Sequence, residues 1–320
     1  ASRALKMDVN CPHAKNHMAL AKLEMGEWEE GWDYWENRWE VPERLRMKRD
    51  YKCPKWDGSP LDGTLVIHGE QGLGDEILYM SCFNEVKAER IIIESATRLV
   101  SLFKRSFNVP VYGTAEEVMR HEKPDRWISM GSLPALFRKT DESFERQPER
   151  FLVPDSKRVE HWKSKLGENP IGIAWYGGVA KTHSKLRNAP LDLWKDLTST
   201  NHNFISIQYE TGDTVKEAEA LGVPHFQEAV EDFDDLTSLI EACDSIITVC
   251  QTAHHTAGGL GKPCWTLVPP AAAWRYGLKG EKNVWYPSVR QFRGDWETIF
   301  SKVKHELDIG RVSTAERSAA

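Results

Sequence analysis

The chain has 320 residues, 40% of them hydrophobic and 28% charged, and a formal net charge of −6. This length is enough for two domains of ordinary size. The composition is typical of a globular protein, and no stretch approaches the roughly 18 apolar residues of a membrane-spanning helix. The net negative charge disfavours a protein whose whole surface binds nucleic acid.

The cysteines are scattered along the chain and form no C-x-x-C pair, which argues against a zinc site and is typical of a reducing compartment. They are Cys11, Cys53, Cys82, Cys243, Cys250 and Cys264. The first residues lack the apolar core of a signal peptide. We therefore expect a cytoplasmic protein.

A helical hairpin is predicted for residues 14–39, with a break at Gly26. Four of the 13 tryptophans recur at helical spacing in its second half, at Trp28, Trp32, Trp35 and Trp39. Such a stripe predicts a packing face. The hairpin resembles one tetratricopeptide-type unit, which cannot bury both of its faces alone. We expect it to pack on the domain that follows.

Residues 43–62 form a charged connector that contains six cationic side chains: Arg44, Arg46, Lys48, Arg49, Lys52 and Lys55. Two interpretations are open. The connector is a solvated loop, or it is a contact surface for an anionic acceptor.

Apolar strands alternate with helices from Thr64 onward, which predicts parallel sheets covered by helices on both faces. Strands are predicted at 65–68, 90–94, 109–112, 126–129, 171–175, 203–208, 245–249 and 264–268, and helices at 75–86, 97–107, 191–197, 232–243 and 296–307. The alternation restarts after Pro154. Four parts are expected: a hairpin (1–42), two Rossmann-like domains (43–155 and 156–308) facing a cleft, and a disordered tail (309–320).

The first predicted strand ends in a glycine-rich loop that contains Gly72, Gly74 and Asp75. Glycines at a strand-to-helix turn allow close approach of a ligand to the backbone. Asp75 is either a helix cap or a general base. Glu94 lies 20 residues after Gly74, where a dinucleotide site has its ribose-binding acid. A nicotinamide-dependent enzyme is therefore an alternative.

A second loop, residues 176–187, is basic and follows the first strand of the second alternating segment. Four of its residues can contact a phosphate, Lys as a point charge and Arg through two parallel hydrogen bonds: Lys181, His183, Lys185 and Arg187. The alternative is a surface loop without a ligand.

The stretch from Ile246 to Pro263 predicts a strand, a polar turn and a small-residue helix. Polar groups at such a turn mark the ligand-binding edge of an α/β sheet, and the helix start suits a phosphate. Gln251 and Thr252 are candidate ligand contacts, with His254 or His255 beside them. By contrast, Asp232 to Asp235 open an amphipathic helix, so we interpret them as caps and not as metal ligands.

Four stretches together resemble GT-B glycosyltransferases of the heptosyltransferase-like group, in the subgroup with a preceding tetratricopeptide segment. They are 70–75, 172–175 with 187–191, 204–208, and 246–263 with Pro269, Trp274, Arg275 and Tyr276. The resemblance implies an inverting transfer from a nucleotide sugar without an essential metal. It implies that Asp75 is the general base, that Arg187 and Lys181 meet the leaving diphosphate, and that Gln208 and Trp274 lie at the donor.

One departure from this family is Cys250-Gln251, which stands where the family usually has an acid followed by Thr or Ser. The sugar and the base of the donor are therefore open. The acceptor is a saccharide, a lipid-linked glycan or a protein hydroxyl. A modified base in phage-type DNA is an alternative that the basic connector, Tyr51 and Trp56 would suit. A degenerate transferase that only binds a glycan is a further alternative.

Overall fold

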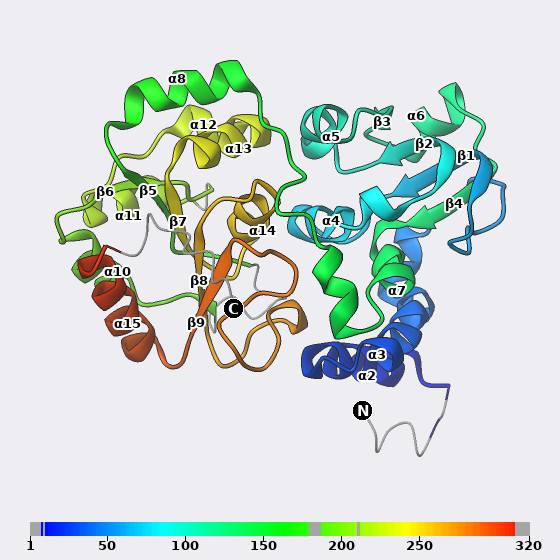
Figure 1. The fold of residues 1–320 in the computed structure, drawn as a ribbon, viewed down its shortest axis with the longest axis horizontal. Helices are drawn as coiled ribbons and strands as arrows, with labels where there is room; N and C mark the ends of the chain where they lie inside the picture. The colour runs from blue at the N-terminus through cyan, green and yellow to red at the C-terminus, as the bar shows by residue number, and fades with distance from the viewer. Residues whose placement is uncertain (1–7, 9, 179–186, 210–211, 311–320) are drawn as a thin grey trace. The chain divides into compact units, whose positions relative to one another are not determined.

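The computed structural model describes residues 8, 10–178, 187–209 and 212–310. The chain forms two compact units, each built around a parallel sheet (Figure 1). The first contains Ala1–Gln147 and Ala273–Leu278, and the second contains Pro148–Ala272 and Lys279–Ala320. Within the described ranges, no helix is both long and apolar enough to cross a membrane.

The first unit begins with two packed helices, α2 (Pro12–Met25) and α3 (Trp28–Trp35). Gly26 ends α2 with a φ of 78°, a left-handed conformation that favours glycine. Two 3₁₀ helices follow, Glu36–Glu40 and Pro42–Met47. The predicted stripe is confirmed as a packing face for Trp28, Trp32 and Trp35, which are buried, whereas Trp39 is half-buried.

Helix α3 is fixed to the rest of the first unit by three indole N–H groups. Trp28 donates to Asp141 Oδ1 over 2.7 Å, Trp32 to the Arg138 carbonyl over 2.6 Å, and Trp35 to the Gly131 carbonyl over 2.8 Å. All three acceptors lie in residues 131–141, around helix α7 (Leu133–Phe137), which α3 contacts. The helices at the start of the chain are thus part of the unit that contains the first sheet.

The first sheet has the order β3-β2-β1-β4, and all of its neighbours are parallel. Its strands are β1 (Leu61–His68), β2 (Ala88–Glu94), β3 (Val111–Tyr112) and β4 (Arg126–Ser129). Its helices are α4 (Leu73–Met80), α5 (Val100–Phe107) and α6 (Ala115–His121), and short 3₁₀ turns lie at 83–85, 97–99, 130–132 and 141–146.

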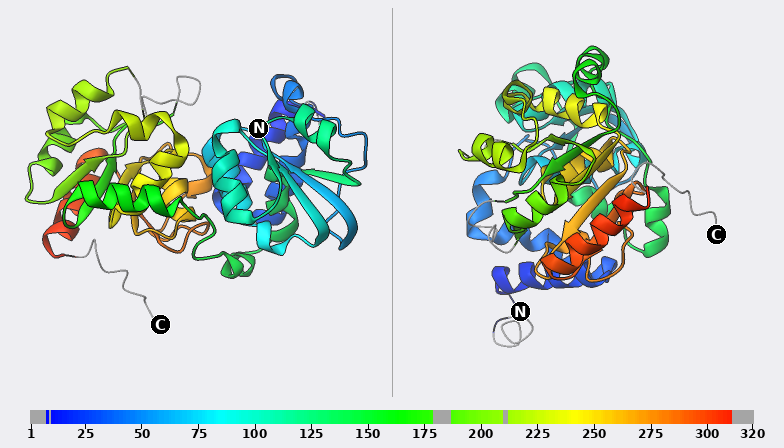
Figure 2. Two further views of the ribbon diagram at one scale, coloured as in Figure 1. Left: turned by 90° about the horizontal axis from the view of Figure 1, so that it is seen from above. Right: turned by 90° about the vertical axis from the view of Figure 1, so that its left-hand side faces the viewer.

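The second sheet has the order β6-β5-β7-β8-β9 and is also entirely parallel. Its strands are β5 (Pro170–Ala174), β6 (Asn203–Ser206), β7 (Ser245–Val249), β8 (Cys264–Val268) and β9 (Val289–Arg293). Helices cover both faces (Figures 1 and 2). They are α8 (Ser156–Leu166), α10 (Leu191–Thr198), α11 (Thr214–Leu221), α12 (Gln227–Glu231), α13 (Phe233–Ala242), α14 (Thr252–Gly259) and α15 (Trp296–Asp308).

Helices α10, α11 and α15 share one apolar core with the second sheet. Trp194, Leu221 and Phe300 from these helices pack with Ile173 and Ile247 from the strands. Helix α13 contacts α8, α12 and α14. Because β5, β6 and β7 are parallel, their carboxyl ends lie at one edge of the sheet, where the connecting loops begin.

Several predicted bounds are wrong. Helix α4 begins at Leu73 and ends at Met80, so it is shorter than the predicted 75–86. Strand β5 ends at Ala174, because the next N–H group, that of Trp175, donates to the side chain of Gln208, and β6 ends at Ser206. Helices α6, α8, α11 and α12 and strand β9 were not predicted.

Candidate active site

Asp75 lies in the first turn of α4, directly after β1 and its loop. Its carboxylate accepts the N–H of Gly72, the residue that precedes the helix, over 3.2 Å. It also forms an ion pair with the guanidinium of Arg275. The Asp75 side chain is 20% exposed, so solvent or a ligand still reaches it. The structure therefore gives Asp75 a capping contact without hiding its carboxylate.

Arg275 belongs to residues 273–278, the segment that lies between β8 and β9 in sequence but in the first unit in space. Trp274 anchors this segment because its buried indole packs on Trp32 and Trp35, with ring centroids 5.6 and 5.8 Å apart. The Arg275 guanidinium lies 5.5 Å from the centroid of the Trp274 ring. Trp274 is thus a packing residue here, and its predicted donor contact stays a prediction.

The loop before α4 is held by a buried ion pair between Arg38 and Glu70. Arg38 donates to the two carboxylate oxygens over 2.6 and 2.9 Å, and Glu70 also accepts the Gly131 N–H over 3.0 Å. Burial alone raises the pKa of Glu70, but the attraction and hydrogen bonds of Arg38 outweigh it and lower that pKa to about 2. Arg38 also donates to Ser129 and Ser132. The pair fixes the loop that presents Asp75.

Glu76, the next residue on α4, is buried and accepts the Ala96 N–H over 3.0 Å. Burial raises its pKa to about 8, the Ala96 hydrogen bond opposes this shift, and the carboxylates of Glu94 and Asp75 add to it. Glu76 is therefore protonated at neutral pH. Two adjacent acids on α4 thus lie in different surroundings, Asp75 partly exposed and Glu76 buried.

Glu94 does not offer the carboxylate that the nicotinamide alternative requires. It is buried, accepts Arg49 N–H groups over 2.9 to 3.1 Å and accepts the hydroxyl of Tyr51. All of these contacts are internal to the first unit. A ribose would have to displace them to reach Glu94, and the nicotinamide alternative stays a prediction.

Three of the six cations in the predicted basic connector have an ion-pair partner. Lys52 pairs with Asp50, Lys55 pairs with Glu36, and Arg49 pairs with Glu94. The two aromatic residues that would suit a DNA acceptor, Tyr51 and Trp56, are 5% and 3% exposed. A DNA acceptor is therefore not supported by this surface.

At the edge of the second sheet, Gln208 holds the loop after β5. Its side-chain oxygen accepts the N–H groups of Trp175 and Tyr176 over 3.0 and 2.8 Å, and its side chain is fully buried. The next N–H, that of Gly177, donates to Asn188 over 2.8 Å. Gln208 is thus a residue that positions this loop, and its predicted place beside a nucleotide stays a prediction.

Gln251 and Thr252 lie where β7 passes into α14. Gln251 precedes the helix, is 8% exposed, and its side-chain nitrogen has no hydrogen-bond partner among the described residues. Thr252 is half-buried and starts the helix. A buried N–H donor beside a helix N-terminus favours an anion or a neutral acceptor group. This edge can therefore bind a phosphate or a sugar oxygen.

Both histidines of α14 are buried and hydrogen-bonded. His254 Nδ1 lies 2.7 Å from the hydroxyl of Thr266, and His255 Nδ1 lies 3.0 Å from the hydroxyl of Tyr286. Gly258 permits this packing, because a Cβ on it would lie 2.3 Å from the Tyr286 ring. His255 is thus oriented by Tyr286, and its contact with a donor stays a prediction.

The remaining predicted residues are only partly described. Arg187 is half-buried and lowers the pKa of Tyr209, which burial and Tyr176 raise, so the arginine lies near this edge of the sheet. Gly74 is buried in α4. Lys181, His183 and Lys185 lie outside the described residues, as does most of the predicted tail.

Asp232 caps α13 by accepting the N–H of Asp234 over 2.9 Å, which confirms its interpretation as a cap. In the parts of the chain that the structure covers, no three His, Cys, Asp or Glu side chains gather in a way that could hold a metal ion.

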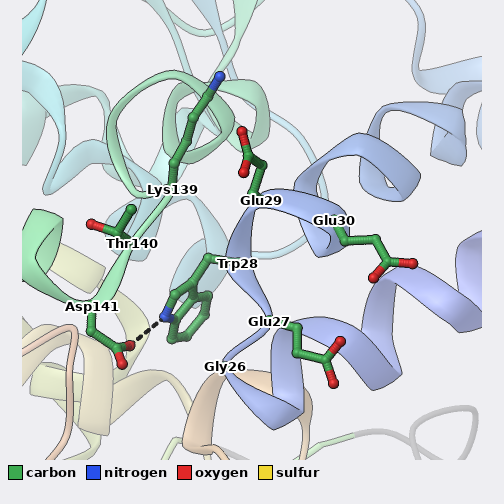
Figure 3. A pocket seen from close by; sticks show the side chains of 8 residues that line it. All are labelled: Gly26, Glu27, Trp28, Glu29, Glu30, Lys139, Thr140 and Asp141. Atoms are coloured by element: carbon green, nitrogen blue, oxygen red, sulfur yellow. Dashed lines mark hydrogen bonds between the residues drawn. The ribbon is translucent and has the colours of Figure 1, made fainter.

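The first unit also has an open hollow of about 360 Å³ beside the turn between α2 and α3 (Figure 3). Asp141 accepts the indole N–H of Trp28 there, and Glu27 and Glu30 both pair with Lys22. Its lining residues are Gly26, Glu27, Trp28, Glu29, Glu30, Lys139, Thr140 and Asp141. No residue predicted from the sequence to carry chemistry lines it.

Sequence reasoning did not pair Asp75 with Arg275 or Glu70 with Arg38. The first two residues are 200 positions apart and the second two are 32 apart, and neither spacing is a motif. The sequence signal that could have indicated a structural role for Arg38 is its place next to Trp39, at the end of the tryptophan stripe. In the structure its guanidinium lies 5.0 Å from the Trp35 ring and 4.7 Å from the Trp39 ring.

In sequence, the chain is similar to protein FlbA of Caulobacter vibrioides, with 29% identity over 334 residues. The match covers 94% of this chain and 54% of FlbA, so the chain spans about half the length of that curated relative. No family model matches the sequence.

In structure, the chain is similar to E. coli ADP-heptose lipopolysaccharide heptosyltransferase II, with a TM-score of 0.51, 13% identity, and coverage of 77% of this chain and 98% of that one. A family 9 glycosyltransferase from Veillonella parvula gives a TM-score of 0.53 at 11% identity, covering 79% and 91% of the two chains. E. coli heptosyltransferase WaaC with ADP-2-deoxy-2-fluoro heptose gives 0.50 at 9% identity, covering 77% and 99%.

These three structural similarities indicate the fold of the chain. The chain has an α/β fold with two parallel sheets, and this fold matches that of the heptosyltransferases.

Proposed function

We propose that this protein is a glycosyltransferase that moves a sugar from a nucleotide-sugar donor to an acceptor hydroxyl, with inversion and without an essential metal. The observation that carries the proposal is the edge at Gln251 and Thr252, where a buried N–H donor without a partner among the described residues meets the start of α14. The heptosyltransferase fold supports the same assignment, since WaaC was solved with an ADP-linked sugar.

In the proposed reaction, Asp75 is the general base. The acceptor oxygen forms a bond to the anomeric carbon while the bond from that carbon to the diphosphate breaks. The hydroxyl proton passes to Asp75, and the electron pair of the broken bond leaves on the nucleoside diphosphate. Each carboxylate oxygen of Asp75 has more than one lone pair, so the contacts with Gly72 and Arg275 leave capacity for the acceptor hydroxyl.

In this proposal the second unit binds the nucleotide-sugar donor. Arg187 and the first N–H groups of α14 would stabilise the charge that develops on the diphosphate. Gln208 would act indirectly by holding the backbone of Trp175 and Tyr176. His255, oriented by Tyr286, would contact the donor from within α14.

Replacement of Asp75 by Asn tests the base. The amide keeps the size of the side chain but cannot take the proton, so we expect sugar transfer to fall by about 100-fold or more while nucleotide binding persists. Transfer is measured as release of nucleoside diphosphate from the donor that binds, over a panel of methyl glycosides and hydroxyl-bearing peptides.

Arg275→Gln is the matched control, because it removes the same ion pair and leaves the carboxylate. If Asp75→Asn keeps wild-type turnover, Asp75 is only a cap of α4 and the assignment of the base is wrong.

A further inference from the structure

We propose that Arg44 is an anion-binding residue of the unit that contains Asp75, and that it binds a carboxylate or phosphate group of the acceptor. This inference rests on the proposed function for the identity of the ligand as an acceptor. The binding site itself rests on the surroundings of Arg44 alone.

The geometry places Arg44 and Arg275 on one aromatic cluster. The Arg44 guanidinium lies 5.5 Å from the Trp35 ring, and Trp35 packs on Trp274 at 5.8 Å. Arg275 lies over Trp274 at the same distance of 5.5 Å and pairs with Asp75. The two guanidinium groups therefore lie on neighbouring indole rings, one of them in contact with the proposed base.

Among the described residues, Arg44 differs from Arg38, Lys55 and Arg275 because its side chain has no ion-pair partner. Its Nη1 is buried without a hydrogen-bond partner, and no ion pair joins its side chain to any described residue. Arg38 is taken by Glu70, Lys55 by Glu36, and Arg275 by Asp75. Three carboxylates that could attract Arg44 are thus already neutralised by other cations.

A half-buried guanidinium without acceptors loses water without regaining hydrogen bonds. Burial lowers the pKa of Arg44, whereas Tyr79, Glu70 and Asp75 oppose that shift and Arg38 adds to it. Asp75 thus acts electrostatically on Arg44 within the same unit. An anion held at Arg44 would regain the lost hydrogen bonds, because a guanidinium binds carboxylate and phosphate through two parallel N–H donors.

The unit in which Arg44 lies indicates whether the bound anion is part of the donor or of the acceptor. Arg44 and Asp75, the proposed base for the acceptor hydroxyl, belong to the same unit. The donor edge at Gln251 is in the other unit. The anion is therefore assigned to the acceptor, which narrows the acceptor class to a saccharide that carries a carboxylate or a phosphate.

The test compares binding of three probes by calorimetry at constant ionic strength: methyl glucuronide, glucose 1-phosphate and the neutral methyl glucoside. We expect the wild-type protein to bind a charged probe and to ignore the neutral one. Arg44→Gln should weaken that binding by about tenfold or more, and Arg44→Lys should restore part of it because the charge returns. The preferred charged probe distinguishes a carboxylate from a phosphate.

Lys48→Gln is the control, since Lys48 is exposed, lies in the same connector and loses the same charge. It should bind the charged probe as the wild-type protein does. Equal binding by wild type and Arg44→Gln, or no preference for a charged probe, would overturn the inference.

A different result would show that the proposed glycosyltransferase function is wrong while the anion site at Arg44 is right. In that case no nucleotide sugar stabilises the protein, yet the charged probe still binds in an Arg44-dependent way. Retained unfolding temperature in Arg44→Gln shows that its loss of binding does not come from loss of the fold.

Discussion

Asp75 and Glu76 are consecutive acids with opposite surroundings. Asp75 is partly exposed and carries an ion pair, whereas Glu76 is 4% exposed and accepts one backbone N–H. In a helix, adjacent residues face different directions, so one acid points to the edge of the sheet and the next into the core. This difference supports a chemical role for Asp75 and a structural one for Glu76.

The raised pKa of Glu76 gives the stability of the protein a defined pH dependence. An unfolded glutamate releases its proton near pH 4.5, whereas folded Glu76 keeps it to about pH 8. Between these values the folded state binds more protons than the unfolded state, so the free energy of unfolding falls as the pH rises. The stabilisation is complete below pH 4.5 and is lost through about pH 8.

We predict that Glu76→Gln removes this dependence, because the amide stays neutral. At pH 9 the variant should be more stable than the wild-type protein by about 2 to 4 kcal/mol, and at pH 4.5 the two should be similar. Urea unfolding at the two pH values measures this. The exposed Glu29→Gln is the control, and an unchanged pH dependence in Glu76→Gln would contradict the prediction.

At the scale of elements, the packing of α2 on α3 depends on a close approach at Gly31. A Cβ at this position would lie 2.7 Å from Leu23 Cδ2 and 3.1 Å from the Leu23 backbone nitrogen. Because α3 is also fixed by its indole hydrogen bonds, it has little freedom to move away.

Gly31→Ala should therefore lower the free energy of unfolding of the first unit by about 1 to 3 kcal/mol, even though alanine is the better helix former. Chemical unfolding followed by tryptophan fluorescence measures the loss. Glu29→Ala on the exposed side of α3 should change stability by no more than about 0.5 kcal/mol. A Gly31→Ala protein as stable as wild type would show that the two helices separate easily.

The elements differ in how well the sequence predicts them. Strands β4, β7 and β8 have the predicted bounds, because each is a short run of strand-forming residues between clear breaks. Strand β9, Val-Arg-Gln-Phe-Arg, does not alternate apolar and polar residues and carries two arginines, so its sequence is typical of an exposed segment. It is one of the two edge strands of the sheet, where charged residues are typical.

At the scale of the molecule, the two parallel sheets are confirmed, whereas the contacts that complete the candidate site were not predictable. Residues 273–278 leave the second unit, join the first through Trp274, and bring Arg275 to Asp75. Hydrophobic periodicity reports local structure only, so it cannot indicate that a segment between two strands of one sheet packs in the other unit.

Binding of a nucleotide sugar is the most direct test of the proposed function. Thermal unfolding is measured with a panel of UDP-, ADP-, GDP-, CMP- and dTDP-sugars, with NAD as the comparison ligand. We predict that at least one of the UDP-, ADP-, GDP- or dTDP-sugars raises the unfolding temperature in a concentration-dependent way and that NAD does not, because a ligand bound to the folded state stabilises it. Stabilisation by NAD with no response to any nucleotide sugar would contradict the proposal.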